Sequence, residues 1–252
     1  VSNVWLWLSV GDMGTELRQL QDEGRDVTPL RRKLQVMIEL GDERIATPAN
    51  QRKAAELLDA AGKLKMRKGY PYNEPSDLAG IRKLRKRGPR KYAKPLTDRV
   101  LLDRVTGAWI GRCVGCLLGK ASEGVRTDRF WPFLKATGQW PMSNYIRFGA
   151  KGKVAKEFPD MVRRSWCDDI DHMPVDDDTN YTTTGFMIVK RNGADFTPAD
   201  VGQFWLGNLP ILATCTAERV AYRNLVMGAQ PPASAAFRNP FREWIGAQIR
   251  AD

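Results

Sequence analysis

A cluster of aspartates is the part of this chain whose residue types most directly offer chemistry. Six of the eleven residues from 168 to 178 are aspartate, ending in the consecutive Asp176, Asp177 and Asp178. The 252-residue chain as a whole is basic, with a net charge of +11. Neighbouring carboxylates repel one another unless a cation or a proton compensates them, and Mg²⁺ prefers oxygen donors of this kind. The cluster is therefore a candidate site for a divalent metal ion.

The local structure around the three consecutive aspartates decides whether they can share one ion. Consecutive side chains inside a helix point about 100° apart, whereas the first residues at a helix start are not yet helical. Pro174 precedes the aspartates, and apolar residues at helical spacing follow them: Tyr181, Phe186, Met187 and Val189. A helix start favours negative charge, so we expect Asp176 to cap a helix here. A capped helix beside a solvated acidic loop, without a metal, is the alternative.

Two other acid-rich metal sites do not fit the sequence. The motif of helical prenyl-diphosphate enzymes needs an aspartate at its fifth position. That position is His172 when counted from Asp168, and Tyr181 when counted from Asp177. An EF-hand needs alternating acids, a central glycine and a distal glutamate, and this segment lacks them.

The cysteines indicate packing in a reducing environment rather than a zinc or redox site. Only Cys113 and Cys116 of the four cysteines lie close together, and His172 is the sole histidine, which is a poor ligand set for structural zinc. No stretch approaches the roughly 18 apolar residues of a membrane span. The N-terminus also lacks the basic flank and cleavage site of a signal peptide. We therefore expect a cytoplasmic protein without a membrane partner.

Helical periodicity dominates the rest of the chain. Apolar residues recur at helical spacing over residues 12–68, with Gly41 as a helix end and Thr47-Pro48 as a helix start. Further predicted elements are helices from Thr97, over 179–190, 198–208 and 215–228, and from Pro240 onward, with a loop over 138–175. Sustained alternation of period two is absent. The predicted fold class is therefore all-α, without a parallel sheet.

The helix predicted from Thr97 combines an apolar face with a ridge of glycines. Its apolar residues are spaced for one buried face: Val100, Leu101, Val105, Trp109, Ile110 and Val114. Glycines recur every four residues, at positions 107, 111, 115 and 119. Because glycine has no Cβ, we expect another helix or a ligand to approach this ridge closely.

A basic segment precedes this helix. Residues 77–86 predict a short helix, and the chain from Arg82 to Lys94 carries eight lysines and arginines without an acid. Such a patch can hold a polyanion, but only Tyr92 offers an aromatic platform on which bases could stack. We interpret the segment as a solvated linker, so nucleic acid is not the expected partner.

Three ordered segments resemble the ADP-ribosylglycohydrolase family. Residues 106–124 are similar to the family's opening glycine-rich helix and the acidic loop after it, residues 176–179 to its Thr-Asp-Asp-Thr metal motif, and residues 239–250 to a glycine-containing loop that lines the substrate pocket. The resemblance implies an all-α bundle with two Mg²⁺ ions, or Mn²⁺, that hydrolyses the bond between ADP-ribose and an attached group. It also implies a helical N-terminal extension with a basic linker at 1–95 and a catalytic domain at 96–252.

The resemblance implies roles for individual residues. Asp177 and Asp178 would be metal ligands, and Asp176 would be a third ligand at a position where the family usually has threonine. Glu123 would position or deprotonate a water molecule near the scissile bond. Cys116 departs from the family pattern, because many members have aspartate there. The implied substrate-binding residues are Gly246, Gln248 and Arg250.

The resemblance also implies that the helical bundle is truncated in this chain. The family's second aspartate-rich metal motif, near its C-terminus, does not occur before Asp252. A continuation of the chain or a second chain would complete the two-ion site and bind the ADP-ribosylated substrate or a related nucleotide. Two other functions stay open: a related N-ribosyl hydrolase or ribosyl-processing enzyme acting on a small molecule, and a catalytically silent binding or assembly module.

Overall fold

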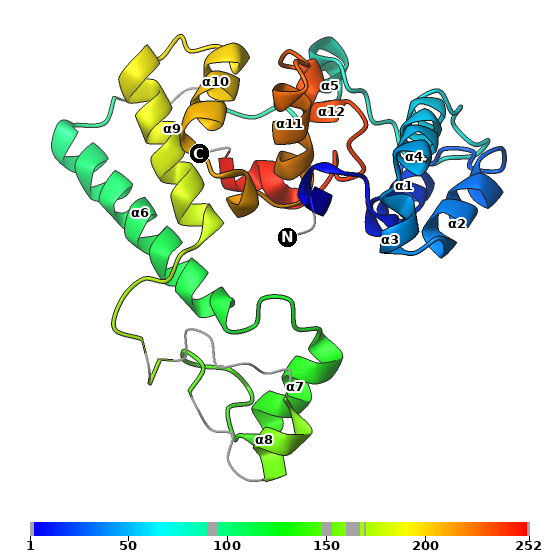
Figure 1. The fold of residues 1–252 in the computed structure, drawn as a ribbon. Coiled ribbons are helices and arrows are strands. Elements are labelled where there is room, and N and C mark those ends of the chain that lie inside the picture. The colour runs from blue at the N-terminus through cyan, green and yellow to red at the C-terminus, as the bar shows by residue number, and fades with distance from the viewer. Residues whose placement is uncertain (1–2, 90–94, 148–152, 160–166, 169, 251–252) are drawn as a thin grey trace. The chain divides into compact units, whose positions relative to one another are not determined.

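The protein is built from helices (Figure 1). The computed structural model describes residues 3–89, 95–147, 153–159, 167–168 and 170–250. Within them the elements are η1 (Asn3–Leu6), α1 (Val10–Asp22), α2 (Arg31–Glu39), α3 (Asp42–Ile45), α4 (Pro48–Ala61), α5 (Leu78–Leu84), α6 (Asp98–Lys120), α7 (Thr127–Ala136), α8 (Lys153–Glu157), α9 (Asp177–Asn192), α10 (Pro198–Asn208), η2 (Ile211–Ala213), α11 (Thr216–Val226), α12 (Ala233–Ala236) and η3 (Ile245–Arg250). These described residues contain no strand, and an isolated antiparallel bridge joins Arg25 to Met66. The predicted all-α class is confirmed.

Contacts group the chain into two compact units. The first unit contains residues 1–87 together with 185–251, and the middle unit contains residues 88–184. The sequence predicts a boundary after residue 95, which lies near the observed boundary after residue 87. The sequence groups residues 185–251 with the middle of the chain, whereas the contacts place them in one unit with residues 1–87. Within the described ranges, no helix is both long and apolar enough to cross a bilayer.

Helices α1 to α4 of the extension enclose a small apolar core. Ser9 and Asp12 form a capping box at the start of α1, with side-chain to backbone distances of 3.0 and 3.1 Å. Thr47 caps α4 and Pro48 is its first residue, as predicted. Gly41 separates α2 from α3 at φ 78°, a left-handed conformation that favours glycine. The most buried residues of this core are Met13, Leu20, Leu34, Ile45, Ala54 and Ala61.

The remainder of the first unit is held by polar side chains. Helix α10 begins with a capping box between Thr197 and Asp200 and spans the predicted residues 198–208. Helix α11 buries an unusually polar face that includes Arg219 and Arg223. The Asn224 amide on the same helix donates to the Ser234 carbonyl at 2.8 Å and to the Phe237 carbonyl at 2.7 Å. These bonds fix α12 and the turn that follows it.

The helix predicted from Pro240 onward is wrong in its type and its start. Residues 240–244 form turns, and the element that follows is the 3₁₀ helix η3. The reason is local hydrogen bonding. The Asn239 side chain accepts from the Phe241 amide at 3.0 Å and donates to the Ala217 and Ala235 carbonyls at 3.0 and 2.8 Å. An asparagine that bonds the nearby backbone in this way competes with a regular helix.

Helix α6 of the middle unit begins at the Thr97 cap, as predicted, but its predicted burial is wrong. The six residues of the expected buried face are each 40–57% exposed, and no residue of α6 is buried. A Cβ atom at any of its four ridge glycines would meet nothing within 4 Å. An apolar stripe shows which face a helix can bury, but burial also requires a covering element. The described residues supply none for this face.

Helices α7 and α8 form a second, smaller core in the middle unit. Phe133 and Leu134 on α7 are fully buried and pack with Ile146 and Phe158. The sequence predicts a loop over 138–175, and this prediction is wrong for α8, which brings Val154 against the same core. The element is a single short turn of helix, which is too short to produce a recognisable apolar period.

Candidate metal centre

The acidic cluster forms the start of α9, as predicted. The Asp176 carboxylate accepts a hydrogen bond from the Asp178 amide at 3.0 Å, which caps the helix. The Asp176 carbonyl accepts from the Asn180 amide and the Thr179 hydroxyl, both at 3.1 Å. Only 8% of the Asp176 side chain is exposed. The cap therefore holds one carboxylate in a buried and fixed position.

One face of α6 lies against this helix start. Arg112, Cys116 and Lys120 are spaced four residues apart and so share one side of the helix. The Lys120 ammonium lies 3.3 Å from the Asp176 carboxylate. The Arg112 guanidinium donates to the Asp178 carbonyl at 3.3 Å and lies 4.0 Å from its carboxylate. Two cations of α6 therefore compensate two carboxylates of α9.

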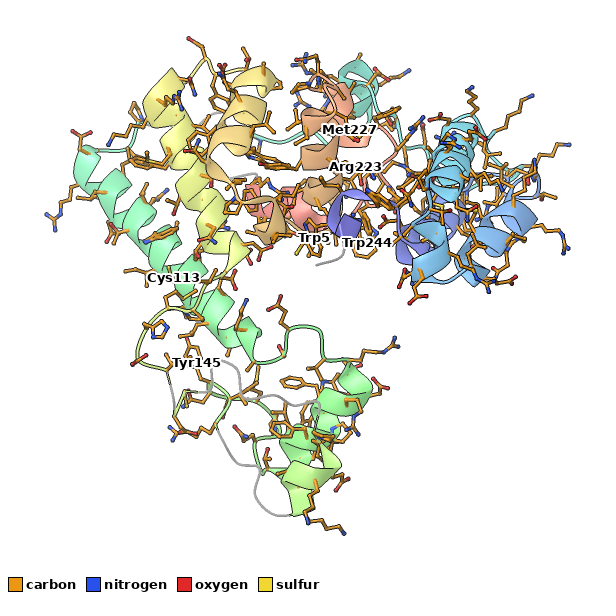
Figure 2. All side chains as sticks on the ribbon, viewed as in Figure 1. Trp5, Cys113, Tyr145, Arg223, Met227 and Trp244 are labelled. Atoms are coloured by element: carbon orange, nitrogen blue, oxygen red, sulfur yellow. The ribbon has the colours of Figure 1, made fainter. Side chains whose placement is uncertain are left out.

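A tyrosine from the following loop contacts the same helix. The Tyr145 hydroxyl donates to the Val114 carbonyl of α6 at 3.3 Å. Figure 2 labels Tyr145 and also Cys113, the residue that precedes Val114 on α6. This bond ties the loop after α7 to the helix that carries the candidate centre.

Three side chains are close enough to share a metal ion. The possible ligand atoms of Cys116, Asp176 and Asp178 all lie within 4.8 Å of one another. The sequence predicts both aspartates as ligands but assigns Cys116 to packing. The signal that could have found it is the spacing of Cys116 between Arg112 and Lys120, since all three share the α6 face that meets the cluster.

Burial and charge perturb each of the three groups differently. Burial raises the pKa of the Cys116 thiol to about 12, aided by the charges of Asp176 and Asp178, so the thiol is protonated near neutral pH. Burial, together with the neighbouring Asp176, also raises the pKa of Asp178. Burial acts in the same direction on Asp176, but hydrogen bonds from the Asp178 amide and Lys120 outweigh it and lower the pKa of Asp176. Asp176 is therefore the more firmly ionised carboxylate.

The two carboxylates fit a hard divalent cation, whereas the thiol does not contribute to that fit. Mg²⁺ is commonly bound through one or two carboxylates and keeps several waters. A protonated thiol is a poor ligand, because the thiolate is the form that coordinates metals. The Lys120 ammonium contacts the Oδ2 atom of the Asp176 carboxylate, and the Asp178 amide donates to its Oδ1 atom. An ion and the Lys120 ammonium would therefore compete for this carboxylate.

The other predicted residues of the centre lie at its edge. Asp177 is the first residue of α9 and its side chain is exposed, outside the group of three. Glu123 is exposed just beyond the end of α6, where its carboxylate lies 3.0 Å from the Lys120 ammonium. Lys120 therefore bridges Glu123, the predicted water-positioning residue, and Asp176, a predicted ligand.

The predicted substrate-binding residues belong to η3 of the first unit. Gln248 is exposed and Gly246 is partly buried. The Arg250 guanidinium forms an ion pair with the buried Glu218, donates to the Gly246 carbonyl and lies 5.5 Å from the centre of the Trp205 ring. The Arg250 side chain is thus already engaged within its own unit.

Comparisons of the chain with protein-family models, curated proteins and solved structures found no match.

Proposed function

We propose that this chain functions in the metal-dependent hydrolysis of an N- or O-glycosidic bond of an ADP-ribosyl group. The observation that carries the proposal is the Lys120 bridge between Asp176 and Glu123. It joins a carboxylate suited to a metal ion and a carboxylate suited to water activation. The resemblance of three ordered sequence segments to ADP-ribosylglycohydrolases supplies the substrate class.

Asp176 and Asp178 are the residues that would hold Mg²⁺ or Mn²⁺, with Asp177 beside them. A divalent ion at such a site would orient ribose hydroxyls and activate a water molecule, and the family resemblance implies two such ions. Cleavage of a ribosyl bond develops positive charge at the anomeric carbon, which nearby carboxylates stabilise. The carboxylates of the α9 start supply that negative charge.

Glu123 and Lys120 support the proposed reaction, the first as a proton acceptor and the second by orienting the first. The exposed Glu123 carboxylate is available to accept a proton from water. Lys120 fixes the orientation of that carboxylate through their 3.0 Å contact. Arg112 offsets the charge of Asp178, so that both aspartates can stay ionised at close range.

The proposal is tested by measuring metal binding and hydrolysis on the same variants. Asp176→Asn and Asp178→Asn should each weaken Mn²⁺ binding, measured by titration calorimetry, and abolish release of ADP-ribose from ADP-ribosyl-arginine and ADP-ribosyl-serine. Asp195→Asn removes an exposed carboxylate from the loop after α9 and serves as the control. Unchanged hydrolysis in both cluster variants would contradict the metal assignment.

Two rival functions are separated by the same assays. Hydrolysis of free nucleosides in place of ADP-ribosyl amino acids would indicate a related N-ribosyl hydrolase. A silent binding module is favoured by one observation, namely that Lys120 and Arg112 already compensate the carboxylates without a metal. That function predicts no Mn²⁺ binding at millimolar concentration and no hydrolysis of any of these substrates.

A further inference from the structure

The N-terminal extension and the segment from α11 to η3 meet through charged side chains. The extension has its own apolar core, whereas α11 turns Arg219 and Arg223 toward the interior. Arg238 and Arg242 follow in the turns after α12. Burying cations is costly unless they are paired and hydrogen-bonded. The partners of these arginines therefore determine how the segment is held.

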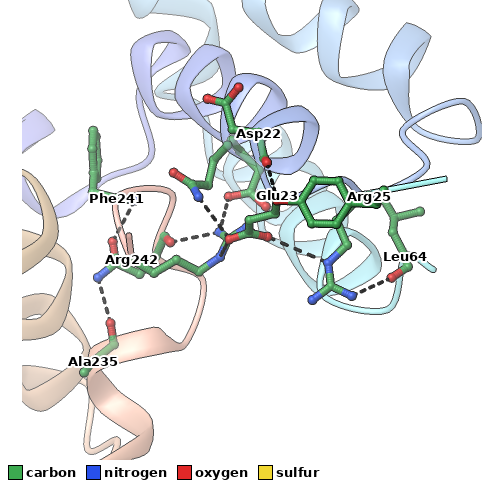
Figure 3. Close-up of polar contacts among 11 residues, drawn as sticks. Asp22, Glu23, Arg25, Leu64, Ala235, Phe241 and Arg242 are labelled. Carbon is green, nitrogen blue, oxygen red and sulfur yellow. Dashed lines mark hydrogen bonds and ion pairs between the residues drawn. The ribbon is translucent and has the colours of Figure 1, made fainter. Parts of the chain in front are cut away.

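Arg242 donates hydrogen bonds to two glutamates of the extension. Its Nε and Nη2 atoms donate to the two Glu23 carboxylate oxygens at 2.8 and 2.9 Å, and its Nη1 atom donates to Glu16 at 2.8 Å. The Glu16 side chain is only 4% exposed. Figure 3 shows Arg242 extended toward Glu23 across this contact, with Arg25 on the other side of Glu23. A two-pronged arginine–carboxylate pair fixes orientation as well as distance.

Arg238 and Arg219 make matching contacts with the extension. Arg238 donates from Nε and Nη2 to the two Asp59 oxygens, both at 2.7 Å. Its backbone has φ 46°, a left-handed conformation that is uncommon for arginine. Arg219 donates to the buried Asp12 carboxylate at 2.7 Å and to the Trp5 carbonyl at 3.0 Å. All three arginines are thus bound by acids that lie at least 179 residues away in sequence.

Two of the bound arginines lie at the start of the predicted substrate segment, residues 239–250. Arg242 lies within it and Arg238 immediately precedes it. Arg219 lies 5.8 Å from the centre of the Phe241 ring, which packs edge-on against Trp244 at 4.9 Å. The extension therefore fixes both the start of the segment and its first aromatic residues.

We propose that Asp12, Glu16, Glu23 and Asp59 are positioning residues that set the conformation of segment 239–250, and through it the binding of the ADP-ribosyl group. The second half of this statement rests on the proposed function. The extension is then an obligate part of the substrate site rather than a separable appendage. None of the four acids is expected to touch substrate.

Amide hydrogen exchange on the full chain tests the conformational half of the proposal, namely that the four acids set the conformation of segment 239–250. In Glu16→Gln/Glu23→Gln, amides of residues 239–250 should exchange about tenfold faster or more, because a broken buried pair favours local opening. Amides of α2 and α4 should keep their protection, because the apolar core of α1 to α4 contains no residue of segment 239–250. Glu39→Gln/Glu43→Gln removes two exposed carboxylates from the same extension and should change nothing. Equal exchange in the two double variants, or loss of protection throughout the unit, would overturn the proposal.

Swapping the two residues of the Asp59–Arg238 ion pair controls for misfolding of the variants. Asp59→Arg and Arg238→Asp should each speed exchange in 239–250, and the double variant should restore it, because aspartate also tolerates left-handed backbone. If the double variant recovers no protection, charge pairing does not set the conformation of segment 239–250.

Ligand binding tests the functional half of the proposal, namely that the four acids support binding of the ADP-ribosyl group through segment 239–250. The Glu16→Gln/Glu23→Gln variant should bind ADP-ribose about tenfold more weakly than the Glu39→Gln/Glu43→Gln control, with kcat on ADP-ribosyl-arginine reduced less than the rise in KM. Wild-type protein that neither binds nor hydrolyses these ligands would refute the proposed function, while the exchange data would still decide the conformational half. Wild-type affinity in the variant would refute the positioning role alone.

Discussion

The Lys120 ammonium lies 3.3 Å from the Oδ2 atom of the Asp176 carboxylate, the group proposed above to bind a metal ion. The same ammonium contacts Glu123 at 3.0 Å. These two contacts raise the pKa of Lys120 even though burial opposes its charge, so it is a cation at any physiological pH. The structure thus contains an internal competitor for the metal ion that Asp176 is proposed to bind.

Removing this competitor should strengthen metal binding. In Lys120→Gln, the Kd for Mn²⁺ should fall about tenfold, because a positive charge within a few ångströms of the site is lost. The metal-free variant should also be less stable, since two carboxylates lose their partner. Calorimetric titration gives the Kd, and thermal melts with and without Mn²⁺ give the stability. Lys190→Gln removes an exposed cation from α9 and is the control. Weaker binding in Lys120→Gln would indicate that Lys120 supports the ion instead.

The two aspartates of the centre should respond oppositely to loss of charge. The pKa of Asp176 is lowered from 3.8, so its charge stabilises the fold above pH 3.8, and that contribution is lost as the pH falls through its folded value. The pKa of Asp178 is raised from 3.8. Its charge is therefore unfavourable above that pH, and fully so once the pH exceeds the folded value.

Melting temperatures in metal-free buffer test this contrast. At pH 7 Asp176→Asn should melt below the wild type and Asp178→Asn above it. The Asp178→Asn difference should shrink as the pH falls through the raised folded pKa of Asp178 toward 3.8. The Asp176→Asn difference should shrink only below pH 3.8, as the pH falls toward the lowered folded pKa of Asp176. The expected gain in Asp178→Asn is small, since 39% of the Asp178 side chain is exposed to screening water. A lower melting temperature for Asp178→Asn at pH 7 would contradict the inferred repulsion.

Local signals in the sequence predict the helix starts well, because a cap depends on residues within one turn. Thr47-Pro48, Thr97 and Thr197-Pro198 each begin a helix where predicted. The buried face predicted for α6 fails for a different reason. The stripe of apolar residues is real, but the sequence does not show what covers it, and burial depends on that partner.

Local sequence signals do not predict the long-range ion pairs. Asp59 and Arg238 are 179 residues apart, and each is an unremarkable charge in its own segment. Cys116 likewise resembles a packing residue until α6 and the start of α9 are placed side by side. Sequence spacing identifies the carboxylate-bearing helix start, whereas the cations and the thiol that complete the centre are supplied by another helix.

The cysteines should differ in reactivity. The Cys116 thiol has its pKa raised to about 12 by burial and by the neighbouring carboxylates, and the thiolate is the reactive form. Cys215 is exposed. Iodoacetamide at pH 8 should therefore alkylate Cys215 well before Cys116, as read by peptide mass spectrometry over time. Adding Asp176→Asn should speed modification of Cys116, because one of the charges that suppress its ionisation is removed. Faster labelling of Cys116 than of Cys215 in the wild type would contradict this electrostatic description.

The ridge glycines of α6 offer a test of its uncovered face. A Cβ at Gly111 or Gly115 meets nothing within 4 Å among the described residues. Alanine lowers the backbone entropy lost on forming a helix, so Gly111→Ala and Gly115→Ala should each stabilise the protein by up to about 1 kcal/mol. Gly24→Ala is the opposite control, because Gly24 has φ 72° and an added Cβ would collide with the Tyr70 ring. Denaturant melts report all three. If the α6 substitutions destabilise the protein as Gly24→Ala should, another helix or chain must pack closely on the ridge in solution.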